Sequence, residues 1–170
     1  MVFSLETTWK HIATTQTSLY RNFLLPLWAL IVISSFIGKW LISRNGSLEL
    51  GVKTAISEVF ILFIGFFVTA FILNEYIKRL TDVIKNIKAT RIFTAYSSSL
   101  IYLVDIIVSL ANDLFFLWLF TLYTFYIVYV GAEIFYRIIP ERRVSFMVIA
   151  TVLILGIPLV VKYLLSLIIS

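Results

Sequence analysis

The chain has 170 residues, of which 61% are hydrophobic, 16% aromatic and only 14% charged. A soluble domain carries roughly 25% charged residues, so a chain this apolar cannot cover its surface with polar groups in water. The mean hydropathy of +1.03 predicts an integral membrane protein with room for about five or six helical spans. Cysteine is absent, which excludes disulfides and thiolate chemistry, and a single histidine, His11, excludes a multi-histidine zinc site within one chain.

The first predicted element is an N-terminal segment, residues 1–22, which precedes the first long apolar run. Leu5, Trp9 and Ile12 share one helical face, and tryptophan favours the headgroup zone of a membrane. This pattern predicts a short cytoplasmic helix lying on the membrane surface. The alternative is a frayed lead-in to the first span.

Five apolar runs follow, and each is long enough to cross about 30 Å of hydrocarbon at about 1.5 Å per residue. They cover residues 23–42, 54–77, 92–111, 114–136 and 144–169. None alternates as barrel strands do, so the sequence predicts an all-α bundle of five transmembrane helices over residues 23–170. Asn112 and Asp113 separate the third and fourth runs and predict a tight turn, which makes these two runs a helical hairpin.

Lysine and arginine are unequally divided between the two sides that five spans define. The N-terminal segment and the second and fourth loops hold ten of them, whereas the other side holds four. The positive-inside rule then places the N-terminus in the cytoplasm and the C-terminus outside. The net charge of +5 is interpreted in the same way, as a sign of orientation, and no nucleic-acid partner is expected.

The loop from Lys78 to Arg91 is the most informative one. Its apolar residues from Leu80 to Ile87 recur at helical spacing, with cations mainly on the other face. This predicts a basic amphipathic helix that anchors to an anionic leaflet or docks a partner. The alternative is that the loop only continues the second and third spans into the interface. The cations of this candidate interfacial helix are Lys78, Arg79, Lys85, Lys88 and Arg91.

Several short phrases occur in a fixed order over about residues 8–165. Thr8–Ile12 precedes the first span, Leu24–Leu27 opens it, and Ile72–Glu75 closes the second. The longest phrase is Tyr123–Glu133, which is followed by Ile139–Arg143 and by Gly156–Pro158. Taken together, these phrases resemble the Yip1 family of small polytopic membrane proteins, particularly its short bacterial branch.

The resemblance implies five helical spans, a cytosolic N-terminus and an outward C-terminus. Eukaryotic relatives act in vesicle trafficking and contact Rab-type GTPases, and their Asp-Leu-Tyr-Gly-Pro phrase is missing from this sequence. For the bacterial branch the resemblance supplies a fold more firmly than an activity. It places the protein in the bacterial cytoplasmic, or inner, membrane.

Polar residues inside the spans are functional candidates, because an ionisable group at bilayer depth costs at least about 2.5–3.5 kcal/mol. Asn74, Glu75 and Glu133 are predicted near the inner face. Glu75 has Arg79 four residues later and Glu133 has Arg137 at the same spacing, so two helical ion pairs are expected there.

The other three candidates, Glu58, Asp105 and Lys162, are predicted in the outer half of three different spans. No opposite charge lies one helical turn from Asp105 or Lys162, so we expect these two to pair between helices, with Glu58 competing for Lys162. The alternatives are a role in moving a proton or cation, and snorkelling of Lys162 toward the interface.

No catalytic motif, metal-ligand spacing or phosphate-binding loop is found, so the sequence assigns no catalytic, metal or cofactor-binding residue and predicts no enzyme. The first functional hypothesis is a membrane organiser that docks membrane or cytosolic proteins in addition to contacting the lipid bilayer. The alternative is a small transporter or channel for protons, ions or small solutes that uses Asp105, Glu133 and Lys162. A single five-helix bundle has little room for a pore, so this alternative requires a homo-oligomer.

Overall fold

The computed structural model describes residues 20–43, 45–80 and 86–169, and every regular element in these ranges is a helix. The N-terminal surface helix expected over residues 1–22 therefore lies almost entirely outside the described residues. In chain order the elements are η1 (Tyr20–Leu24), α2 (Leu25–Ile37), η2 (Gly38–Ile42), α3 (Leu48–Leu80), α4 (Ile87–Ser97), α5 (Ser99–Leu110), η3 (Asn112–Leu122), α6 (Tyr123–Tyr136) and α7 (Pro140–Ile169).

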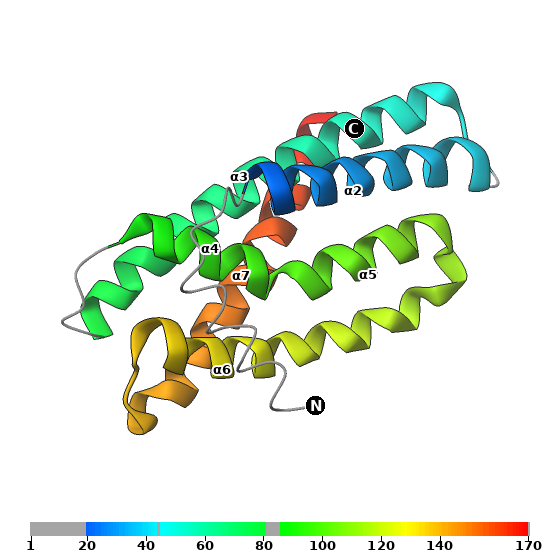
Figure 1. Ribbon diagram of the computed structural model, residues 1–170. Helices are drawn as coiled ribbons and strands as arrows, with labels where there is room; N and C mark the ends of the chain where they lie inside the picture. Colours follow the sequence, from blue (N-terminus) through cyan, green and yellow to red (C-terminus); the bar gives the residue numbers. More distant parts are fainter. Residues whose placement is uncertain (1–19, 44, 81–85, 170) are drawn as a thin grey trace.

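Four helical stretches within the described residues are long and apolar enough to cross a membrane: Tyr20–Ile42, Leu48–Arg79, Asp113–Tyr136 and Pro140–Ile168. The pair α4–α5, bent by 41°, gives a fifth crossing if it counts as one span. Each of the five predicted apolar runs overlaps one of these four stretches or the α4–α5 pair. Figure 1 shows α2 beside α3, and α5 beside η3 and α6, with α7 passing behind them.

Local sequence explains where the helices begin and end. Pro140 begins α7, a position where a missing N–H costs nothing, whereas Pro26 lies just after the π-helical η1 within the continuous stretch Tyr20–Ile42. Asn86 caps α4 by accepting hydrogen bonds from the backbone N–H groups of Lys88 and Ala89. The expected turn at Asn112 reverses the chain, and α5 packs on η3 as the predicted hairpin.

The α4–α5 break lies in a run of three serines, at Ser98. The Ser98 hydroxyl donates to the carbonyl of Thr94 at 2.8 Å, and the Ser99 hydroxyl donates to that of Tyr96 at 2.7 Å. Serine hydroxyls that bond back to the preceding turn compete with the backbone ladder and bend helices. The largest bend among the spans therefore has a local cause in the sequence.

Two buried clusters hold the helices together. One joins α3, α4, α6 and α7 around Phe93 and Phe146, which are both fully buried. The other joins η1, α2, α3 and the α4–α5 pair around Leu24, Ile31 and Phe66. The first cluster lies toward the end of the bundle where α3 ends and α7 begins, because Ile77 and Ile138 belong to it.

Two glycines allow close helix contacts in this bundle. A Cβ on Gly38 would overlap the backbone carbonyl of Ser109, and a Cβ on Gly65 would lie 3.3 Å from Cγ of Pro158. Small residues at such positions let helix backbones approach closely in a membrane. Gly38 thereby brings η2 against α5, and Gly65 brings α3 against α7.

Candidate functional site

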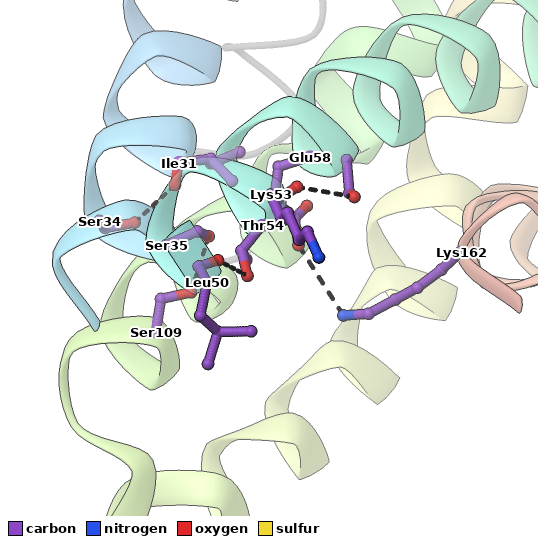
Figure 2. A network of polar contacts seen from close by, with 10 residues as sticks. Ile31, Ser34, Ser35, Leu50, Lys53, Thr54, Glu58, Ser109 and Lys162 are labelled. Carbon is purple, nitrogen blue, oxygen red and sulfur yellow. Dashed lines mark hydrogen bonds and ion pairs between the residues drawn. The ribbon is translucent and has the colours of Figure 1, made fainter. Parts of the chain in front are cut away.

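Three charged residues converge inside the bundle, near the end that holds the α2–α3 connection and the α5–η3 turn. Lys162 Nζ on α7 lies 3.9 Å from Oε1 of Glu58 on α3, as Figure 2 shows. Asp105 on α5 lines the same cavities as both. The Glu58 side chain is 10% exposed and that of Lys162 61% exposed, so the lysine reaches from an open side to a buried acid.

The structure thus places Asp105 and Lys162 in the lining of one site. The ion pair within 4 Å, however, joins Lys162 to Glu58, which was expected to compete with Asp105 for this lysine. Helix packing explains the difference. α7 packs extensively on α3, where Gly65 meets Pro158, whereas α5 has at most marginal contact with α7. Lys162 therefore faces Glu58 across a packed helix pair and faces Asp105 across open space.

This open space is a cavity of about 740 Å³, here called the polar chamber. It is bounded by α2, η2, α3, α5, η3 and α7, with Glu58, Asp105 and Lys162 in its lining. Most of its remaining lining is hydroxyl-bearing or cationic. These residues are Ser35, Lys39, Lys53, Thr54, Ser57, Ser109 and Ser166.

A narrow pocket of about 80 Å³ shares the same three charged residues and leads deeper into the bundle. Apolar side chains such as Phe66 and Pro158 form most of its lining. The exceptions include Thr69 and Thr94, which are only 2% and 1% exposed and whose hydroxyls have no hydrogen-bond partner in the structure. These two hydroxyls are therefore polar groups in an otherwise mostly apolar lining.

Beyond the narrow pocket the bundle is closed. Asn74 accepts a hydrogen bond from Thr90 at 3.2 Å, and the Tyr136 hydroxyl donates to the Thr90 oxygen at 3.2 Å. All three residues are buried beside the cluster around Phe93 and Phe146. Asn74, one of the sequence candidates, thus links α3 to α4 and α6 at the far end from the polar chamber.

Glu133 does not join Asp105 and Lys162. It is exposed at the opposite end of the bundle and pairs with Arg143 of α7 at 2.8 Å. The expected Glu133–Arg137 pair is wrong, because α6 ends at Tyr136 and Arg137 takes a left-handed conformation with φ of 49°. An i,i+4 pair requires a helix that continues through both residues.

The expected Glu75–Arg79 pair is also not among the ion pairs of the described residues, although both lie within α3. Glu75 does have an interaction of its own, and Arg79 is exposed in the last turn of the helix. Adjacency on one helix face permits such a pair without requiring it.

A single basic helix from Lys78 to Arg91 is not formed. α3 continues to Leu80, while Asn86 is non-helical and caps α4, so the described parts of the loop extend the two neighbouring helices. Lys85 lies outside the described residues. Arg91 turns into the bundle, where its guanidinium stacks over Phe67 at 5.1 Å and donates to the Tyr20 hydroxyl.

Besides Arg142, which is exposed and has an interaction of its own, four exposed cations lie at this opposite end, here called the cationic end: Lys78, Arg79, Lys88 and Arg137. None of the four forms an ion pair with another described residue. The described candidates from the sequence therefore separate into two places. Asn74, Glu75, Glu133 and the loop cations lie toward one end, and Glu58, Asp105 and Lys162 lie at the cavity toward the other.

The chain was also compared with known proteins. The family model of the Yip1 domain matches residues 1–162, which is nearly the whole chain. The chain belongs to the Yip1 family. It is an integral, multi-pass membrane protein of Yip1 type, as its apolar helices independently indicate. No curated protein and no solved structure matches it significantly.

The charged cluster of this Yip1 protein was visible in the sequence, but its surroundings were not. Thr90, Thr94 and Ser98 recur every four residues, and this polar stripe signals a face of α4 that avoids lipid. Lys39 and Ser57 carry no such signal, because polar residues near the end of a span are common at the interface. No group of three or more His, Asp or Glu side chains in the described ranges is arranged to hold a metal ion.

Proposed function

We propose that this protein is a non-enzymatic organiser of the bacterial inner membrane that docks partner proteins at its cationic end. The observation that carries the proposal is the set of exposed, unpaired cations contributed by α3, α4 and the α6–α7 turn. A free surface cation near an anionic leaflet is worth about 1 kcal/mol, so four of them favour anionic lipids and acidic protein segments together. The ten-to-four division of cations supports a cytoplasmic location for this end.

Recovery of partners from native membranes tests this proposal. The wild type and a variant with Lys78, Arg79, Lys88 and Arg137 all changed to glutamine are cross-linked in cells and purified in several mild detergents. We expect the wild type to recover a reproducible set of proteins and the variant to lose most of it. Glu141→Gln, which removes an acid from the same end, is the control and should keep the set. Recovery of the wild type alone in every detergent contradicts the proposal.

A second candidate function is transport of protons, ions or small solutes. The polar chamber favours it, because a cavity with intramembrane charges that is closed at the other end by a packed aromatic cluster resembles one state of a transport cycle. Glu58, Asp105 and Lys162 are its candidate residues, and Glu133 is not, since it lies at the cationic end. The chamber lies within one chain, so the proposal does not require an oligomer.

Flux into proteoliposomes tests the second candidate. We expect wild-type protein to increase the flux of protons or of a monovalent cation over empty liposomes, and Asp105→Asn to abolish the increase. Asp113→Asn, on the α5–η3 turn outside both cavities, is the matched control. Wild-type flux equal to that of empty liposomes for protons, cations and anions removes this candidate.

A further inference from the structure

The polar chamber carries charges of both signs in a fixed arrangement. Glu58, Asp105 and Lys162 lie where it joins the narrow pocket, and Lys39 and Lys53 lie elsewhere in its lining. Lys53 is already paired with Glu49 at 3.1 Å, whereas Lys39 has no ion pair with any described residue. The chamber therefore holds one free cation at some distance from its deepest charges.

The deepest charges are unbalanced. Two carboxylates face one ammonium group, and Lys162 lies close to Glu58, so Asp105 has no ion-pair partner among the described residues. A carboxylate within a membrane span is costly without a counter-charge. An ammonium group entering the chamber would supply that charge beside Asp105. In the adjoining pocket, the hydroxyls of Thr69 and Thr94 have no hydrogen-bond partner among the described residues.

The helices around the chamber are unevenly packed. α7 packs on α3 and α6 but has at most marginal contact with α5 and η3, although all three line the chamber. Figure 2 shows Lys162 extending from α7 across this space toward α3. Trp118 of η3 and Leu165 of α7 both line the chamber, and Trp118 is 38% exposed. A tryptophan at such a place suits the boundary between headgroups and acyl chains.

The chamber also has the right size for a headgroup. Its volume of about 740 Å³ is in the range of roughly 300–1,000 Å³ that is typical of small-molecule sites. The smaller space of the narrow pocket, about 80 Å³, is enough for several water molecules, since one water needs about 10–15 Å³. Water there would satisfy the hydroxyls of Thr69 and Thr94, which an acyl chain would leave unpaired.

We propose that the polar chamber binds the headgroup of a phospholipid that carries a primary amine next to its phosphate, as phosphatidylethanolamine does. The ammonium group lies against Asp105 and Glu58, and the phosphate lies toward Lys39 and Lys162. The acyl chains stay in the bilayer beside Trp118, having entered between α7 and the α5–η3 hairpin. The site does not rest on the docking function proposed above, because it lies away from the cationic end.

Lipid titration of the purified full-length protein tests this proposal. Native mass spectrometry and thermal unfolding in detergent are followed with phosphatidylethanolamine, phosphatidylcholine, phosphatidylglycerol and free phosphoethanolamine. We expect phosphatidylethanolamine to bind about tenfold or more tightly than each of the others, because only it has both the amine donors and the chains that hold it at the chamber. Equal binding of the three lipids overturns the proposal. Free phosphoethanolamine binding as tightly as the lipid overturns the membrane origin of the ligand.

Variants locate the site. Asp105→Asn should weaken phosphatidylethanolamine binding about tenfold while Asp105→Glu keeps it, and Asp113→Asn should bind as the wild type does. Lys39→Gln, which changes an exposed side chain, should weaken binding of the phospholipid but leave binding of free ethanolamine unchanged. Wild-type selectivity in both Asp105→Asn and Lys39→Gln contradicts the assignment of the site.

Discussion

At the scale of single residues, the ion pair between Glu58 and Lys162 is the interaction that links α3 to α7 electrostatically. Glu58 is nearly buried, and its partner comes from another helix, so removing the lysine charge leaves a buried carboxylate uncompensated. We expect a double-mutant cycle of Glu58→Gln and Lys162→Met, followed by thermal unfolding in detergent, to give a coupling of about 1 kcal/mol or more.

The exposed pair of Glu49 and Lys53, 3.1 Å apart on one helix, is the control for that cycle. Its coupling should be only about 0.3–0.5 kcal/mol, because both side chains are largely exposed. Asp105→Asn combined with Lys162→Met should also couple more weakly than the Glu58 pair, since no ion pair joins Asp105 to Lys162. Strict additivity of Glu58→Gln and Lys162→Met would show that the observed pair contributes nothing.

The hydrogen-bonded set of Asn74, Thr90 and Tyr136 gives a second prediction at this scale. Tyr136 is only 4% exposed. Tyr136→Phe removes its hydroxyl and leaves Thr90 with one hydrogen-bond partner fewer. We expect the free energy of unfolding to fall by about 1 kcal/mol. Tyr163→Phe makes the same chemical change at a side chain that is 65% exposed, and its effect should stay within about 0.5 kcal/mol. Equal effects of the two substitutions would show that the buried network is not stabilising.

At the scale of elements, glycine spacing decides how closely two helices pack. Gly38→Ala would force the Cβ into the Ser109 carbonyl and separate η2 from α5, so we expect a loss of about 1–3 kcal/mol in detergent. Gly156→Ala has nothing within 4 Å of the new Cβ and should change stability by less than about 1 kcal/mol. A harmless Gly38→Ala would mean that the two backbones are not held in contact.

The positions of the elements were largely predictable, because an apolar run of span length has few alternatives to a membrane helix. The first and last residues of the elements were less predictable. α3 begins at Leu48 and not near residue 54, since Glu49 and Lys53 lie on the polar first turns of a helix that extends past the hydrocarbon run. The partner of Lys162 was not predictable, because it depends on how α7 is rotated against α3 and on contacts such as Gly65 with Pro158.

At the scale of the whole molecule, charged residues gather toward two ends. The cationic end carries free lysine and arginine side chains, and the other end holds a chamber lined by both acids and lysines. Cation counting along the chain was enough to distinguish the ends, whereas the chamber arises only when α2, η2, α3, α5, η3 and α7 are assembled. No local sequence pattern contains a cavity that six helical elements enclose.

The central claim is that five spans place the cationic end in the cytoplasm and the chain's C-terminus on the opposite side. The native protein has no cysteine, so single cysteines at Arg142, in the first turns of α7, and at Ser170 can be labelled without background. A membrane-impermeant maleimide added to intact cells should label the Ser170→Cys protein and spare the Arg142→Cys protein until the membrane is permeabilised. Labelling of both positions, or of neither, in intact cells would contradict the five-span account.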